Sequence, residues 1–126
     1  MDIEYIPGDL VSVYVGVKKY IVEVIGTENE NEVLLYQIKF PNGEIQYADK
    51  DNIVPIPLTP EILEKNGWEY KYDIYFKEFP HRMLVIMDEN AYIINECCSM
   101  FLCPAKFVPQ LQHLLFGLGL NSEMEV

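Results

Sequence analysis

Residues 34–47, Leu-Leu-Tyr-Gln-Ile-Lys-Phe-Pro-Asn-Gly-Glu-Ile-Gln-Tyr, decide the fold of the N-terminal part of this 126-residue chain. Apolar side chains occupy every second position of the first half, the period of a β-strand with one buried face: Leu34, Tyr36, Ile38 and Phe40. The pair Asn42-Gly43 follows. It favours a type I′ turn, because both central residues of that turn need a positive φ. The stretch therefore predicts a β-hairpin whose second strand covers residues 44–47.

Short strands are also predicted on both sides of this hairpin. We expect them, from alternation or apolar composition, near residues 11–15, 20–25 and 53–56, with polar turns at residues 26–31 and 49–52. Pro55 confines the last strand to an edge or an end of the sheet, because proline cannot donate to a ladder. Short strands joined by tight turns predict a small closed β-barrel over residues 1–57.

The order of these strands resembles that of SH3-like barrels of the Tudor and KOW kind. The resemblance rests on Pro-Gly-Asp-Leu-Val at residues 7–11, on Phe-Pro-Asn-Gly-Glu at residues 40–44 and on Asn-Ile-Val-Pro-Ile at residues 52–56. A Tudor-like barrel implies a groove of aromatic rings that binds a cation or a peptide. The candidates for such a groove are Tyr14, Tyr36, Phe40 and Tyr47. We favour the alternative that most of them form the barrel core and cross-strand pairs.

A short helix is predicted at the start of the second part, residues 58–126. Thr59 suits a helix N-cap and Pro60 suits the first turn. Asn66-Gly67 suits the end of this helix. Trp68 comes next, and we expect it to anchor the core, because buried tryptophan dominates packing.

An antiparallel sheet and a C-terminal helix complete the second part. We expect its strands at residues 73–79, 83–87, 91–96 and 99–102. Apolar residues at helical spacing predict the last helix, with Pro109 in its first turn. Residues 121–126 form a short acidic tail that we expect to fray. The fold class is therefore α+β, with residues 1–57 and 58–126 as two parts that either stand alone or share one core.

Two segments of the second part resemble small uncharacterised proteins of prophage-like and mobile elements in Bacteroides-type bacteria. Residues 106–116, Lys-Phe-Val-Pro-Gln-Leu-Gln-His-Leu-Leu-Phe, are similar to their C-terminal aromatic-Val-His-x-Leu-Gln-Asn-Leu-aromatic pattern. Residues 56–68, Ile-Pro-Leu-Thr-Pro-Glu-Ile-Leu-Glu-Lys-Asn-Gly-Trp, are similar to their middle segment. Pro109 replaces the usual His of that pattern, so a role for that His has no counterpart here. The resemblance implies a phage-derived accessory protein and supplies no catalytic residue, because the family has no known activity.

The formal net charge of −11 is shared by both halves of the chain. Phosphate backbones and anionic membranes are bound by clustered Lys and Arg, which this sequence lacks, so we expect no direct nucleic-acid partner and no membrane partner. Residues 1–5 lack the positive start and the apolar run of a secretory signal. Three cysteines are an odd number, which argues against a disulfide framework. We therefore expect a cytoplasmic protein with reduced thiols.

Cys97, Cys98, Cys103 and His113 form the only cluster in the sequence with metal-ligand character. Its spacing lacks the paired cysteine knuckles of structural zinc sites, and a free cysteine in an apolar strand is usually a small hydrophobic residue. We therefore expect no metal and no cofactor. A thiol nucleophile needs a neighbouring base, and the sequence places neither His81 nor His113 beside a thiol, so no catalytic residue is assigned.

Three functional hypotheses follow. The favoured one is a non-enzymatic protein-interaction module of a phage-like element, which binds a protein partner or itself through the barrel groove or a sheet edge. The second is a cysteine-dependent enzyme or a metal protein. The third is an acidic mimic of nucleic acid that inhibits a DNA-processing enzyme, although the charge is spread evenly rather than concentrated on one element.

Overall fold

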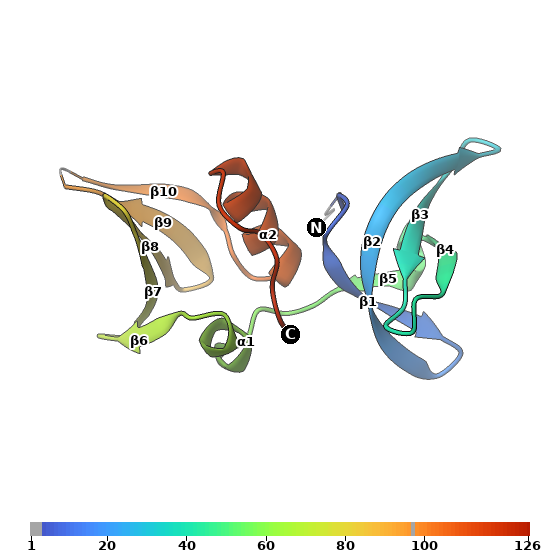
Figure 1. The fold of residues 1–126 in the computed structure, drawn as a ribbon, viewed down its shortest axis with the longest axis horizontal. Helices are drawn as coiled ribbons and strands as arrows, with labels where there is room; N and C mark the ends of the chain where they lie inside the picture. Colours follow the sequence, from blue (N-terminus) through green and yellow to red (C-terminus); the bar gives the residue numbers. More distant parts are fainter. Residues whose placement is uncertain (1–3, 97) are drawn as a thin grey trace. The chain divides into compact units, whose positions relative to one another are not determined.

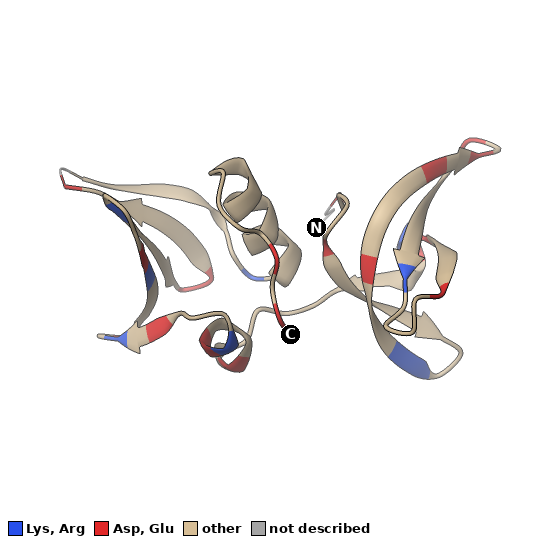
Figure 2. Cartoon of the chain, viewed as in Figure 1, with Lys and Arg blue, Asp and Glu red and all other residues tan. Residues whose placement is uncertain are grey.

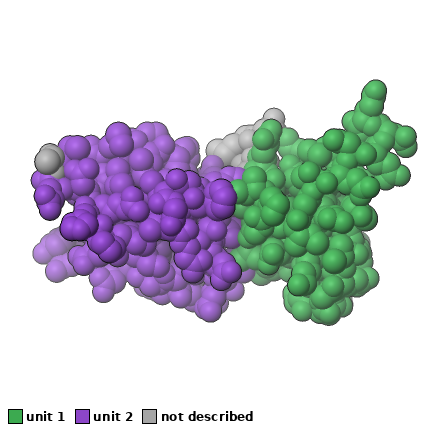
Figure 3. All heavy atoms as spheres, turned by 45° about the horizontal axis from the view of Figure 1, so that its top comes forward, with its two compact units in different colours: residues 1–56 green, residues 57–126 purple. Residues whose placement is uncertain are grey.

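The computed structural model of the chain describes residues 4–96 and 98–126. The chain divides into two compact units, Met1–Ile56 and Pro57–Val126, which Figure 3 shows in different colours. Each unit contains one five-stranded antiparallel sheet, and the two α-helices both belong to the second unit. The predicted α+β class is confirmed.

The first unit is a sheet with the strand order β4-β3-β2-β1-β5 (Figure 1). Its strands are β1 Leu10–Val15, β2 Lys18–Glu30, β3 Val33–Lys39, β4 Ile45–Asp49 and β5 Ile53–Pro55, with the 3-10 helix η1 Lys50–Asn52 before β5. In the described part of the chain no ladder joins β4 to β5. Closure of this sheet into an SH3-like barrel therefore stays a prediction.

The core of the first unit lies on one face of its sheet. Its buried members are Tyr5, Val11, Val13, Val22, Val24, Tyr36, Ile38, Phe40, Ala48 and Ile53. The rings of Tyr5 and Tyr36 meet edge-on with centroids 5.5 Å apart. Burial, together with the neighbouring Tyr36 and Asp9, raises the pKa of Tyr5 to about 12. The alternation therefore has its expected outcome at Tyr36, Ile38 and Phe40, which lie in the core, but not at Leu34, which is 41% exposed.

The turn predicted at residues 26–31 is wrong. β2 continues through this polar stretch to Glu30, and Asn31 and Glu32 alone make the turn, both with positive φ. The pairing with β3 shifts by one residue between Val24 and Gly26. Such a bulge bends a strand without ending it, so the glycine marks a bend rather than a turn.

The hairpin around Asn42-Gly43 is confirmed, but its turn is not of the predicted type. Only Gly43 has a positive φ, at 89°, and its N–H donates to the carbonyl of Phe40 at 2.9 Å. Pro41 therefore occupies the second position of a four-residue turn, where its fixed φ of about −65° suits a type I turn. A type I turn followed by a left-handed glycine is the usual three-residue hairpin connection.

The second unit is a meander with the strand order β10-β9-β8-β7-β6 (Figure 1). Its elements are α1 Pro60–Lys65, β6 Glu69–Lys71, β7 Ile74–Phe79, β8 Arg82–Met87, β9 Asn90–Ile94, β10 Ser99–Pro104 and α2 Val108–Gly117. The sequence predicted each of these except β6, which is three residues long and fully exposed.

Both helices pack on the same face of this sheet. Leu63 of α1 and Leu111 of α2 share one buried cluster with Leu84 of β8 and with Trp68, which is the core anchor expected from the sequence. Thr59 caps α1 as predicted, since its hydroxyl accepts from the Ile62 N–H at 3.3 Å. None of the helices in the described residues is long and apolar enough to cross a membrane.

The C-terminal tail is held against α1, contrary to the expected fraying. The side-chain amide of Asn66 donates to the carbonyl of Glu125 at 2.8 Å, and its oxygen accepts from the Glu125 N–H at 2.9 Å. Gln112 donates to the carbonyl of Ser122 at 3.2 Å, and Met124 packs against the core cluster. The residue that ends α1 therefore also anchors the tail, a pairing 59 residues apart that local sequence patterns do not show.

Candidate interaction surface

The four aromatic residues proposed for a barrel groove separate into two pairs. Tyr36 and Phe40 are 2% and 9% exposed and belong to the core of the first unit. Tyr14 and Tyr47 are 48% and 50% exposed. Only the second pair is therefore available to a ligand.

Tyr14 and Tyr47 lie far apart on the sheet. Tyr14 of β1 pairs with Lys19 of β2, whereas Tyr47 of β4 pairs with Gln37 of β3, which pairs with Gly26 of β2. Tyr14 therefore lies beside Lys19 of β2, and Tyr47 lies in line with Gly26 of β2. These two positions of β2 are seven residues apart, which corresponds to roughly 23 Å along a strand at about 3.3 Å per residue. The structure brings no two of the four proposed residues together in an exposed aromatic cage.

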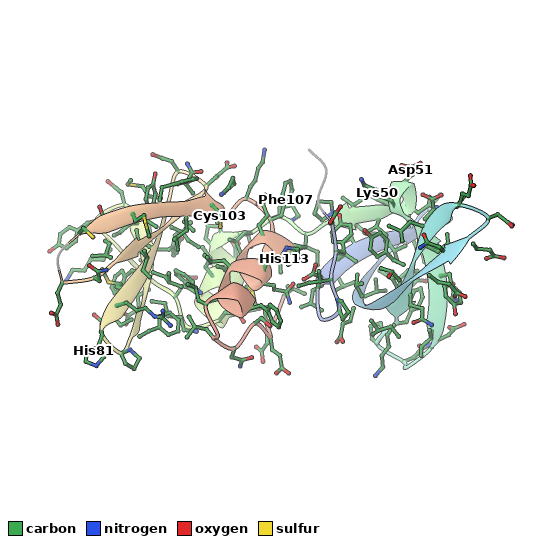
Figure 4. All side chains as sticks on the ribbon, turned by 90° about the horizontal axis from the view of Figure 1, so that it is seen from above. Lys50, Asp51, His81, Cys103, Phe107 and His113 are labelled. Atoms are coloured by element: carbon green, nitrogen blue, oxygen red, sulfur yellow. The ribbon has the colours of Figure 1, made fainter. Side chains whose placement is uncertain are left out.

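The described thiols and histidines lie at three different places. Cys98 is exposed directly before β10, where its Sγ lies 3.6 Å from Oδ1 of Asn95. His81 is exposed in the turn between β7 and β8, with φ at 65°. Cys103 of β10 and His113 of α2 line one pocket (Figure 4). Cys97 is outside the described residues, and among those that are described no three His, Cys, Asp or Glu side chains converge as metal ligands.

Burial raises the pKa of the Cys103 thiol above its ordinary value. The thiolate is the reactive form of cysteine, and catalytic cysteines have lowered pKa values. Cys103 is therefore poorly prepared for nucleophilic chemistry at neutral pH, although it shares its pocket with His113. Its thiol contributes a small apolar wall to that pocket.

The edge strand β10 differs sharply from β6 at the opposite edge of the same sheet. β10 has six residues without any charge, Ser-Met-Phe-Leu-Cys-Pro. β6 has three residues, of which Glu69 and Lys71 are charged. Short length and charge are common devices that keep an edge from pairing with another chain. β6 carries both, whereas β10 carries only a bulge after Phe101 and the terminal Pro104.

An apolar groove runs between β10 and α2. Its volume is about 400 Å³, within the range of about 300–1,000 Å³ typical of ligand pockets. It is lined by Cys103, Pro104, Gln110, His113, Leu114, Gly117 and Leu118. The four helical residues among these recur at the spacing of one helix face, and Leu118 is the C-cap of the helix. We call the groove together with the exposed residues of β10 the β10–α2 surface.

The β10–α2 surface belongs to the longest stretch of the chain without a carboxylate side chain. Residues 99–122 contain no Asp or Glu, although the whole chain has 20 of them. Figure 2 shows β10 and α2 free of acidic positions. Met100 and Phe101 of β10 are 58% and 53% exposed. The net charges of the two halves of the chain are similar, so a comparison of these charges does not reveal the stretch. A search of the sequence for segments without Asp or Glu would reveal it.

The apolar character of β10 continues onto the face of the sheet opposite the helices. There Phe101 pairs with Tyr92, Tyr92 with Val85, and Val85 with Phe76, so that one residue from each of four strands forms a row. The rings of Tyr92 and Phe101 have centroids 5.7 Å apart. The edge at β10 is therefore apolar on both of its faces.

Comparison with protein-family models, with curated proteins and with solved structures finds no match to this chain.

Proposed function

We propose that this protein is a non-enzymatic protein-interaction module that binds its partner through the β10–α2 surface. This proposal is carried by the exposure of β10, in which Met100 and Phe101 are more than half exposed. The same strand borders an apolar groove through Cys103 and Pro104 and lies in a segment without carboxylates. Protein-binding surfaces are depleted in charged residues and enriched in aromatic residues and Met at their centre. The net charge of the whole chain, −11, favours solubility.

The proposed setting is a phage-derived or mobile-element accessory protein of the cytoplasm. It is supported by the resemblance of residues 56–68 and 106–116 to proteins of such elements. We expect no direct contact with nucleic acid or with a membrane, because Lys and Arg do not cluster along the sequence.

Site-specific photo-crosslinking in cells that produce the protein tests this proposal. The photoreactive amino acid benzoylphenylalanine replaces Phe101 in one variant and Tyr72, which is 84% exposed in a turn, in a matched control. A third variant carries it at Tyr14 and tests the barrel groove. We expect one discrete crosslinked protein from position 101 and none from positions 72 or 14. Equal crosslinking at all three positions, or a specific product from position 14 alone, would contradict the proposal.

A second candidate function, mimicry of nucleic acid, is favoured by the hairpin of β2 and β3. Glu28 and Glu30 are exposed at the end of β2, where carboxylates two residues apart on a strand repeat at about 7 Å. Glu32 is exposed in the turn that follows. Replacing all three by Gln should abolish a salt-dependent complex with a DNA-processing enzyme if this candidate is correct. Detection of no such complex at low salt removes it.

A further inference from the structure

We propose that β10 accepts an additional strand: an extended segment of another protein pairs with its open edge and places side chains in the groove between β10 and α2. The segment has an uncharged, strand-forming centre with apolar residues at alternate positions and Lys or Arg on both flanks. This inference rests on the proposed function and adds the chemistry of the partner.

β10 is an edge strand of its sheet. All ladder partners of β10 among the described residues come from β9. Since a strand directs successive backbone N–H and C=O groups to alternate sides, the other side of β10 presents groups for a further strand. A long uncharged edge is the kind of edge at which another chain pairs. Peptide recognition by strand addition takes its affinity from these main-chain hydrogen bonds.

The groove between β10 and α2 has room for side chains of an added strand. A strand added to β10 lies about 4.8 Å from it, and its alternate side chains project to the side of the sheet where α2 lies. The groove of about 400 Å³ equals about a dozen water volumes of roughly 30 Å³ each, room for two large apolar side chains. Leu114 of α2, the C-cap residue Leu118 and Cys103 of β10 form its apolar walls. Alternate pockets for side chains give such sites their specificity.

Exposed acidic side chains lie near both ends of β10. Glu96 is exposed before the start of the strand. Asp88 and Glu89 are exposed in the turn next to its end, where the Ala105 N–H donates to the Glu89 carbonyl at 2.8 Å. Lys106 is the only Lys or Arg in the sequence of residues 83–106. A segment with an uncharged centre and basic flanks complements an uncharged strand with acidic residues near both ends. A second copy of this chain is less suitable, because it also has a net charge of −11 and would be repelled.

The test uses a defined probe, the fluorescein-labelled peptide Lys-Lys-Thr-Val-Thr-Phe-Thr-Val-Thr-Lys-Lys, with fluorescence anisotropy as the readout. One control peptide has Glu in place of the four Lys residues. A second control peptide keeps the four Lys residues and has Ser in place of Val and Phe. Its affinity measures the attraction between the basic peptide and the acidic protein alone. We expect the probe to bind at least tenfold more tightly than either control. Binding equal to that of the Ser peptide overturns the proposal.

Gly117 offers a substitution that fills the groove without crowding the fold. It lines the groove, and a Cβ placed there has no atom within 4 Å. Because Gly is the poorest helix former after Pro, Gly117→Ala and Gly117→Leu should not lower the melting temperature. We expect the probe to bind at least tenfold more weakly to Gly117→Leu and by an intermediate factor to Gly117→Ala. Unchanged affinity for both variants contradicts occupation of the groove.

Two proline variants test the backbone pairing. Met100 and Phe101 are consecutive, so one N–H faces β9 and the other faces the open edge. Proline removes the N–H donor; Met100→Pro and Phe101→Pro should therefore differ. The variant that keeps its melting temperature should lose at least tenfold in probe affinity, and the other should lose stability. A stable variant with full affinity excludes strand addition.

The outcomes also separate this inference from the proposed function. If the crosslink from position 101 persists in Gly117→Leu and the stable proline variant keeps full probe affinity, the surface binds a protein but not by strand addition. If that crosslink never forms, the proposed function itself fails. If light scattering shows a dimer that the stable proline variant abolishes, the occupant of the edge is a second copy and the proposal of a foreign segment is overturned.

Discussion

Asp9 is a buried carboxylate that fixes the entry of the chain into β1. Its Oδ2 accepts from the Ile6 N–H at 2.9 Å, and its own N–H donates to the Ile6 carbonyl at 3.1 Å. Its carbonyl accepts from the Val24 N–H at 2.8 Å, and the residue is 1% exposed. Gly8 before it has φ at 99°, a backbone conformation that favours glycine. The Pro-Gly-Asp sequence is thus explained by one turn that ties residues 6–9 to β2.

Replacing Asp9 by Ala should lower the free energy of unfolding by about 1–3 kcal/mol, the cost of leaving a donor in a buried site without its partner. Asp9→Asn retains a side-chain oxygen of the same reach and should lose less. Urea unfolding followed by circular dichroism measures both values. Equal losses for the two variants would show that the acceptor oxygen is not what stabilises the turn.

Cys103 should react slowly with alkylating reagents, because burial raises its pKa and only the thiolate reacts. In a variant with Cys97 and Cys98 replaced by Ser, the pH at which iodoacetamide reacts at half its maximal rate should lie above that of an ordinary cysteine, about 8.5. At pH 8 the folded protein then reacts more slowly than the same variant in urea. A folded midpoint at or below the unfolded one would revive the hypothesis of a cysteine-dependent enzyme.

At the scale of elements, three two-residue hairpin turns are made without glycine. Positive φ values occur in pairs at Asn31 and Glu32, at Tyr72 and Asp73, and at Asp88 and Glu89. A non-glycine residue in the left-handed region costs roughly 1–2 kcal/mol. These turns therefore hold strain that the pairing of their strands offsets.

Glu32→Gly should raise the free energy of unfolding by about 1 kcal/mol, because it converts the turn to Asn-Gly, the preferred sequence of a type I′ turn. Urea denaturation measures the change. Glu44→Gly, at an exposed position outside these turns, serves as the control and should be neutral or destabilising. A loss of stability in Glu32→Gly would mean that the hairpin does not depend on its turn conformation.

The elements that the sequence predicted correctly are those with strong local signals. Thr59, Pro60 and Asn66 mark both ends of α1, and the alternation around Tyr36 and Ile38 predicts β3. The polar half of β2 was missed because pairing with β3 outweighs its weak strand propensity, and tertiary context commonly does so. β6 was missed because three exposed residues leave no period to detect.

At the scale of the whole molecule, the two units differ in what their sheets leave uncovered. The first unit buries Tyr36 and Phe40, so the proposed aromatic groove loses half of its members to the core. The second unit covers one face of its sheet with α1 and α2 and leaves β10 as an uncharged edge. The sequence pointed to an aromatic groove or a sheet edge as the binding surface, but only the pairing of strands distinguishes an edge strand from an internal one.

Binding of an extended segment at the β10–α2 surface can be located with a map of amide chemical shifts. The ¹⁵N-labelled protein is titrated with the Lys-flanked Val-Phe-Val peptide while amide resonances from both units are followed. We expect the perturbed amides to cluster in β10, Ser99–Pro104, and in α2, Val108–Gly117. Perturbations centred on β4, Ile45–Asp49, or on β1 around Tyr14 would contradict this expectation. A map without any localised change would contradict it as well.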